Sequence, residues 1–206
     1  MLNEFGKGAY ILWRAYPRHR VFIDGRLSVY GRRILEDWCT LTWMHPGWPE
    51  RLEHYGIDFI LGDNRLHPRY YELPDWRLVY WDDVSRIMVK NLPQWRELIE
   101  RFDCGLTCPD TFAATRLKRH GLLGQALAQL QAKVQADPDC LIARVNLASC
   151  YELESRWAEA VEQLRAAYAM EPNDAAVCAK LGQCLLRAGR AEQGRAYARR
   201  AAWLAR

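Results

Sequence analysis

Small and hydrophobic positions in the second half of the chain recur at a fixed interval of 34 residues. The spacing of Ala126, Leu130 and Pro138 is found again 34 residues later. An interval of this length is typical of stacked structural repeats, in which each copy is one pair of helices. Further positions align in the same way, namely Ala114, Ala148 and Gly182; Leu117, Tyr151 and Leu185; and Gly121, Ser155 and Gly189.

Each copy is predicted to fold as two amphipathic helices joined by a turn. Pro138 and Pro172 end the second helix of a pair, because proline cannot continue a helix. The small residues mark the places where two helices cross closely. The predicted copies span residues 107–140, 141–174 and 175–206, and Gly194 lowers the helix propensity of the last one.

These residue types and spacings resemble the tetratricopeptide repeat over residues 107–206. The resemblance implies an all-α solenoid of three helix pairs, whose first helices line a groove that binds a protein or peptide partner. By repeat position, the groove should contain Thr111, Thr115, Lys118, Arg119, Val145, Ser149, Glu152, Leu153, Ala179, Gln183, Leu186 and Arg187.

The groove lacks the residues of the carboxylate-clamping members of this family. Those members need lysine and asparagine at set positions, and here only Asn146 matches one of the asparagine sites. With Lys118, Arg119 and Arg187 at one edge, the groove suits an acidic or extended segment. The alternative is a solenoid that serves only as a spacer or as a dimer surface, so the oligomeric state stays open.

In the first half, short apolar runs alternate with helical patterns. Strands are predicted at residues 20–24 and 58–61, and a hairpin at residues 77–81 and 86–90. Helical spacing appears over residues 34–43 and 49–55, and a short helix is predicted over residues 94–102. We therefore expect an α+β protein: a small α/β domain over residues 1–92, a linker helix over residues 93–106, and the repeats.

Parts of this first half also resemble the soluble C-terminal segment of multi-spanning bacterial membrane proteins that are similar to the C-type glycosyltransferases. The resemblance implies that the chain is the extracytoplasmic, periplasmic end of a longer protein tethered to membrane helices; otherwise it is cytoplasmic. No catalytic residue of that class can be assigned in this chain, because the catalytic residues of those transferases lie in loops between membrane helices. The matching segments are residues 8–13, 16–17, 21–26, 30–31, 46–48, 55–58 and 76–82.

Composition narrows the classes of function. No apolar run exceeds five residues, far short of a membrane-spanning helix, and residues 1–102 contain 15 basic and 14 acidic side chains, so we expect no nucleic acid partner. Seven of the nine tryptophans lie in the first 95 residues, which indicates two different architectures. The Cys104–Cys108 pair has no second half-site for zinc, and we expect two thiols there, with a local disulfide as the alternative. No cofactor or metal is expected.

The main hypothesis is a non-catalytic protein-interaction module, so this chain alone is not expected to be an enzyme. The alternative is a sugar- or nucleotide-binding or catalytic α/β domain, because Asp24, Asp63 and Asp82 each lie at the end of a predicted strand. If those strands were parallel, the three carboxylates would converge on one ligand or cation. Trp48 would then be the stacking platform for a sugar. The simpler interpretation is that these aspartates only form turns and helix caps.

Overall fold

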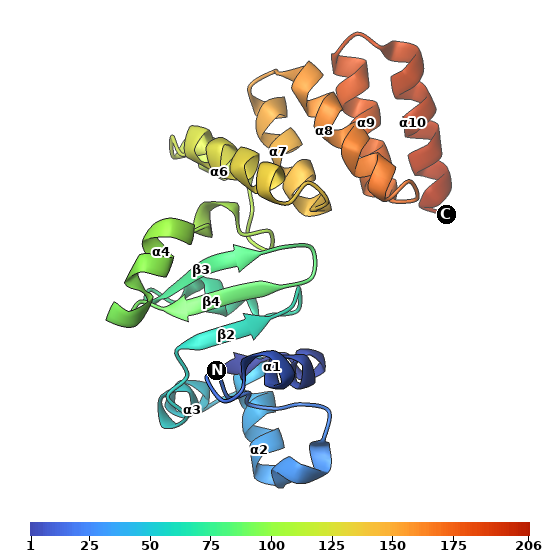
Figure 1. Cartoon of the computed structure of the whole chain (residues 1–206). Helices are drawn as coiled ribbons and strands as arrows, with labels where there is room; N and C mark the ends of the chain where they lie inside the picture. The colour runs from blue at the N-terminus through green and yellow to red at the C-terminus, as the bar shows by residue number, and fades with distance from the viewer. The chain divides into compact units, whose positions relative to one another are not determined.

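The computed structural model describes residues 1–206 and divides into two compact units, Met1–Asp110 and Thr111–Arg206 (Figure 1). The first unit combines a small sheet with helices, and the second is entirely helical. This is the α+β class that the sequence predicts.

The first unit is built around a four-stranded sheet in the order β1-β2-β4-β3. β1 (Leu2–Asn3) runs parallel to β2 (Phe59–Gly62), whereas β3 (Trp76–Trp81) and β4 (Arg86–Lys90) form an antiparallel hairpin and β4 is also antiparallel to β2. The predicted hairpin and the predicted strand at 58–61 are therefore confirmed. β1 has only two residues, which is too short to show a period in the sequence.

Helices cover the rest of this unit. The long helix α2 has left-handed backbone at Gly31 (φ 70°), where it kinks. Residues 93–106, expected as a linker, pack within the first unit, since the Cys104 backbone N–H donates to the Leu78 carbonyl of β3 at 3.0 Å. The α-helices are α1 (Gly8–Ala15), α2 (Leu27–Thr42), α3 (Trp48–His54) and α4 (Arg96–Phe102), and the 3-10 turns are Phe5–Lys7, Pro68–Glu72, Pro93–Trp95 and Gly105–Thr107.

The strand predicted at residues 20–24 is wrong. The segment instead bonds to the side chain of Asn3, which accepts from the Phe22 backbone N–H at 2.8 Å and donates to the Ile23 carbonyl at 2.8 Å. Asn3 is only 2% exposed, so these bonds lie in the interior. One buried amide side chain takes up the backbone groups that a neighbouring strand would otherwise pair.

The segment ends at Asp24, a buried carboxylate. Its side chain is 1% exposed and forms an ion pair with Arg26, with 2.6 Å between Asp24 Oδ2 and Arg26 Nη2. Asp24 Oδ1 also accepts from the Arg26 backbone N–H at 2.9 Å. These hydrogen bonds from Arg26 lower the pKa of Asp24 from 3.8 to about 2, against the opposing effect of burial.

A second buried ion pair lies next to the turn of the β3–β4 hairpin. The side chain of Arg86, 1% exposed, lies 2.7 Å from the carboxylate of Asp110 and also donates to the carbonyls of Asp82 and Ser85. Tyr71 donates its hydroxyl to the same carboxylate at 2.7 Å. The guanidinium thus makes four hydrogen bonds although it is out of water.

The tryptophans contribute only part of the core of the first unit. Trp76 and Trp81 are buried, whereas Trp13 is 75% and Trp43 50% exposed. The fully buried apolar side chains include Ile23, Leu41, Ile60, Tyr70 and Val89 as well as Trp81.

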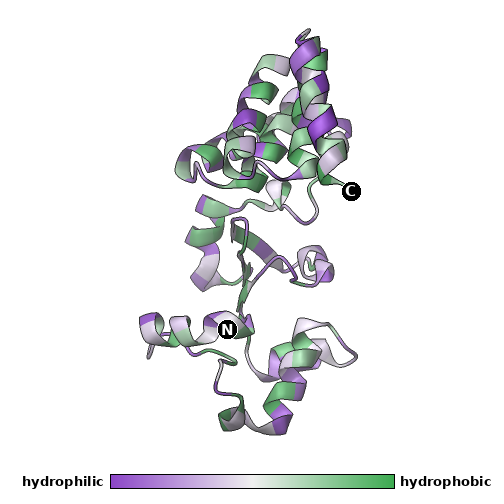
Figure 2. Cartoon of the chain, turned by 90° about the vertical axis from the view of Figure 1, so that its right-hand side faces the viewer, coloured by the Kyte–Doolittle hydropathy of each residue, from purple (hydrophilic) through white to green (hydrophobic).

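The second unit consists of three helix pairs. In Figure 2, polar and apolar colours alternate along these helices, as expected where each buries one face. Helices α6 and α8 end at Ala136 and Met170, two residues before Pro138 and Pro172. The pairs are α5 (Ala114–Arg119) with α6 (Leu123–Ala136), α7 (Leu141–Leu153) with α8 (Trp157–Met170), and α9 (Ala175–Arg187) with α10 (Ala191–Leu204).

The three predicted turn positions share one backbone conformation. Gly121, Ser155 and Gly189 have φ of 71°, 59° and 77°, the left-handed region that reverses the chain after a helix. Ser155 adopts it without being a glycine. The period of 34 residues therefore reproduces backbone geometry as well as residue type.

Helices α9 and α10 touch through two glycines. A Cβ added to Gly182 would lie 3.0 Å from the Gly194 carbonyl oxygen, and one added to Gly194 would lie 2.9 Å from the Gly182 carbonyl oxygen. Gly194 stands at the repeat position of Ala126 and Ala160, both of which are fully buried. Glycine at this position lowers the helix propensity of α10, but it allows α9 and α10 to cross closely.

We expect Gly194→Ala to destabilise the chain by about 1–3 kcal/mol, since the new methyl group would push two backbones apart. The matched control is Gly124→Ala in α6, where a Cβ meets nothing within 4 Å. That substitution should raise stability by up to about 1 kcal/mol through helix propensity. Urea unfolding followed by circular dichroism measures both. Equal effects at the two positions would contradict the close crossing.

We expect Asp24→Asn to lower stability by about 2 kcal/mol near neutral pH, because it removes a buried charge-assisted pair. The folded pKa of Asp24 lies below its unfolded value, so its contribution is present above about pH 4 and is lost as pH falls towards 2. The difference in unfolding free energy between the variant and the parent should therefore narrow over that range. A difference that stays constant with pH would show that the charge of Asp24 is not what stabilises the segment.

Candidate protein-interaction site

The first helices of the three pairs, α5, α7 and α9, contain nearly all of the residues predicted to line the groove. We call the surface they form the helix-A face. Those on α5 and α9 are exposed, and those on α7 are partly exposed. The members are Thr115, Lys118 and Arg119 on α5; Val145, Ser149, Glu152 and Leu153 on α7; and Ala179, Gln183, Leu186 and Arg187 on α9.

Thr111 is the exception. The sequence places it in the first helix of the first repeat, but α5 begins only at Ala114, so Thr111 lies in the preceding turn. Its carbonyl accepts from Arg116 Nη2 at 3.0 Å. Pro109 and Asp110 lie in the same turn, where Asp110 is bound to Arg86.

A lysine on α9 joins that helix to α7. Lys180 Nζ lies 2.9 Å from Glu152 Oε1 and 2.8 Å from Ser149 Oγ, and Ser149 Oγ donates to the Val145 carbonyl. The Lys180 and Glu152 side chains are 31% and 21% exposed, so the pair is partly shielded from water. The negative charge of Glu152 is therefore neutralised within the face.

Cys184 belongs to the same cluster. Its Sγ lies 3.3 Å from Glu152 Oε1. Burial, and then the charge of Glu152, raises the pKa of this thiol to about 12, so it stays protonated and donates to the carboxylate. Sequence reasoning did not place Lys180 or Cys184 in the site. A signal was present, because Lys180 occupies the repeat position of Asn146, which had been compared with the carboxylate clamp.

The Nδ2 atom of Asn146 is buried and has no hydrogen-bond partner. A covered amide donor without an acceptor costs about 1–3 kcal/mol. The polar groups of this part of α7 are therefore less fully satisfied than those of the Lys180 cluster.

A lysine on α5 makes the matching connection to α7. Lys118 Nζ donates to the Leu153 carbonyl at 2.5 Å, near the end of α7 where helix carbonyls lack partners. Two charged residues of the predicted groove remain: Arg119 and Arg187 are exposed and take part in no ion pair. The uncompensated charge of the helix-A face is therefore positive.

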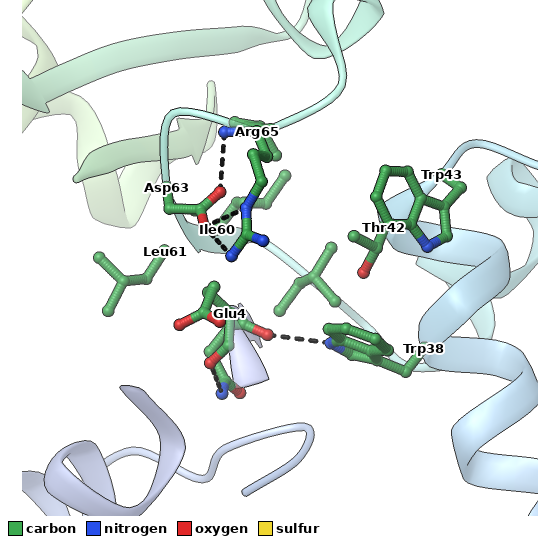
Figure 3. A pocket seen from close by; sticks show the side chains of 12 residues that line it. Glu4, Trp38, Thr42, Trp43, Ile60, Leu61, Asp63 and Arg65 are labelled. Carbon is green, nitrogen blue, oxygen red and sulfur yellow. Dashed lines mark hydrogen bonds and ion pairs between the residues drawn. The ribbon is translucent and has the colours of Figure 1, made fainter. Parts of the chain in front are cut away.

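The first unit holds a cavity of about 110 Å³ between α2 and the β1–β2 edge of the sheet (Figure 3). Trp38 and Trp43 form its helical side, and Trp38 Nε1 donates to the Asn3 carbonyl at 3.0 Å. Asp63 and Arg65 pair across 2.8 Å at its rim. The remaining lining is mostly apolar, from Leu2, Ile60, Leu61 and Leu66.

The four residues of the ligand-binding alternative do not meet in this cavity. Only Asp63 lines it. Asp24 is bound to Arg26, and Asp82 accepts the backbone N–H groups of Val84 and Ser85, so each carboxylate forms a local turn. No group of three or more His, Cys, Asp or Glu side chains is placed to hold a metal ion. A shared cation between Asp24, Asp63 and Asp82 is therefore excluded by the geometry.

The fourth residue of the ligand-binding alternative is Trp48. It starts α3, is only partly exposed, and its ring meets Tyr70 edge-on at a centroid distance of 6.0 Å. Trp43 is more exposed, at 50%. None of the seven cysteines forms a disulfide, including Cys104 and Cys108. No helix has the length and apolar character needed to cross a bilayer.

Comparison with known proteins gives one family and a set of solved structures. The tetratricopeptide repeat family matches residues 152–202. Among solved structures, MamA AMB-1 (crystal form P212121) is 20% identical with a TM-score of 0.42, covering 55% of this chain and 69% of that chain. MamA MSR-1 (crystal form C2) is 16% identical with a TM-score of 0.43, covering 53% and 62%.

None of the curated proteins matches the sequence. The family match spans the end of α7, all of α8 and α9 and most of α10. The second unit therefore has three helix pairs, and residues 152–202 of it are similar to the tetratricopeptide repeat family, whose members are protein-interaction modules.

Proposed function

We propose that the chain acts as a non-catalytic interaction module and binds an acidic peptide segment of a partner protein on the helix-A face. The observation that carries the proposal is the charge balance of this face. Its one carboxylate, Glu152, is neutralised by Lys180, whereas Arg119 and Arg187 stay exposed without ion pairs. A partner with carboxylate groups would complement those two charges.

The hydrogen bonds within the face support this role. Lys118 links α5 to α7, and Lys180 links α7 to α9, so a peptide would meet a surface already held in one arrangement. Preorganisation lowers the entropy lost on binding. The exposed Thr115 and Gln183 side chains add hydrogen-bonding groups along the same face.

We further propose that the chain is the soluble C-terminal region of a glycosyltransferase-like membrane protein and lies on the periplasmic face. The support is the resemblance of the segments between residues 8 and 82, above all Gly8–Trp13 and Trp76–Asp82. In that arrangement the repeats would recruit a partner to the membrane-bound parent.

The test begins with peptides selected from a random library against the full chain. We expect the selected peptides to be rich in aspartate and glutamate. Binding of a synthetic peptide, measured by isothermal titration calorimetry, should weaken at least about tenfold when Arg119→Glu and Arg187→Glu are combined, because two attractions become repulsions.

The matched control is Arg195→Glu on α10, an exposed arginine outside the helix-A face. It changes the net charge in the same direction and should leave the affinity within about twofold, given screening at ordinary salt. Failure to select any peptide would contradict the proposed function. An equal loss of affinity in the control would show that only net charge is being measured.

A further inference from the structure

Helix α1 presents a patch of exposed aromatic side chains. Tyr10, Trp13 and Tyr16 are 64%, 75% and 65% exposed, and the rings of Tyr10 and Trp13 lie 5.9 Å apart. The other side of the helix is buried through Gly8 and Ile11. Large exposed aromatics that touch one another mark an interaction surface more often than a folding requirement.

The helix that bears this patch is firmly held. A Cβ on Gly8 would lie only 2.0 Å from the Ile23 carbonyl oxygen, so α1 lies directly against the backbone of that segment. Just before α1, Lys7 Nζ bonds to Ser85 Oγ at 2.8 Å and to the carbonyls of Gly62 and Val84. The aromatic side chains therefore project from a fixed base.

The charged residues that neighbour these aromatics in the sequence are all positive. Between Glu4 and Asp24 the sequence has no acidic residue, whereas Arg14, Arg18 and Arg20 are exposed and form no ion pair. The Arg14 guanidinium lies 5.4 Å from the centre of the Trp13 ring. We call Tyr10, Trp13, Arg14, Tyr16, Arg18 and Arg20 the α1 surface.

We propose that the α1 surface binds the anionic headgroups of a lipid bilayer. Tryptophan and tyrosine favour the boundary between headgroups and acyl chains, where the ring is apolar and its N–H or O–H stays hydrated. The arginines would bind lipid phosphates, each contributing attraction to an anionic surface. The helix would lie along the bilayer without entering its core.

A bilayer fits this surface better than a nucleic acid or a protein groove. Basic and acidic residues balance over residues 1–102, so the unit lacks the broad positive potential that nucleic acid binding uses. Neither Tyr10, Trp13 nor Tyr16 lines any of the cavities near α2. The aromatics form a projection, which suits insertion between lipids rather than reception of a side chain.

The test measures co-sedimentation of the full chain with vesicles of phosphatidylcholine, alone or mixed with phosphatidylglycerol. We expect binding only to the anionic vesicles, weakening as salt is added. Trp13→Ala should lower the partition coefficient about tenfold, through loss of its interfacial anchor. Combined Arg18→Gln and Arg20→Gln should lower it about 25-fold, at about fivefold for each charge.

The matched controls lie on α10 of the other unit. Trp203 is 68% exposed, and Arg195 and Arg199 are exposed near it in sequence. Trp203→Ala, and combined Arg195→Gln and Arg199→Gln, should bind like the parent chain. All these side chains are exposed, so circular dichroism melting curves should coincide and show that each variant is folded.

Three results would overturn the proposal. The first is that the parent chain does not bind anionic vesicles. The second is that the α10 variants lose binding as strongly as the α1 variants. In the third, the α1 surface would bind a single-stranded oligonucleotide and no vesicle. Peptide binding on the helix-A face is measured separately, so either proposal can fail without the other.

Discussion

Both units depend on places where two backbones come closer than any side chain would allow. In the first unit, Gly8 brings α1 against the Ile23 carbonyl; in the second, Gly182 and Gly194 bring α9 against α10. Interiors are packed at near-crystalline density, so one added methyl group at such a contact must displace backbone. The position of α1, and with it the α1 surface, follows from the first contact. The stacking of the last repeat follows from the second.

The second unit could be predicted almost entirely from the sequence, because its contacts recur with the period of the chain. Ala148 and Gly182 are small because helices cross there, and Gly121 and Gly189 adopt the left-handed turn that the alignment assigned to them. The same alignment located most of the helix-A face. It did not show Lys180 bridging to Glu152, since an ion pair between two helices depends on side-chain geometry that a period does not contain.

The first unit could be predicted only where its contacts are local. The hairpin of β3 and β4 was found from the alternation of its own residues. The segment at residues 20–24 has the apolar pattern of a strand, but Asn3, about 20 residues earlier, bonds to its backbone instead. The three aspartates also make local contacts. Asp24 and Asp63 each bind an arginine two residues away, and Asp82 accepts the backbone N–H of Val84, so local sequence suggests turns more readily than convergence on a ligand.

The Arg86–Asp110 pair also decides how much chain the first unit needs in order to fold alone. A fragment that ended at residue 92, where the sequence pattern suggests the domain closes, would contain the buried guanidinium without its carboxylate. Removing one partner of a buried pair costs about 3–5 kcal/mol, a large share of the stability of a small domain. The smallest autonomous folding unit therefore extends to Asp110. An expression fragment or a natural cleavage product that stops earlier would be prone to degradation.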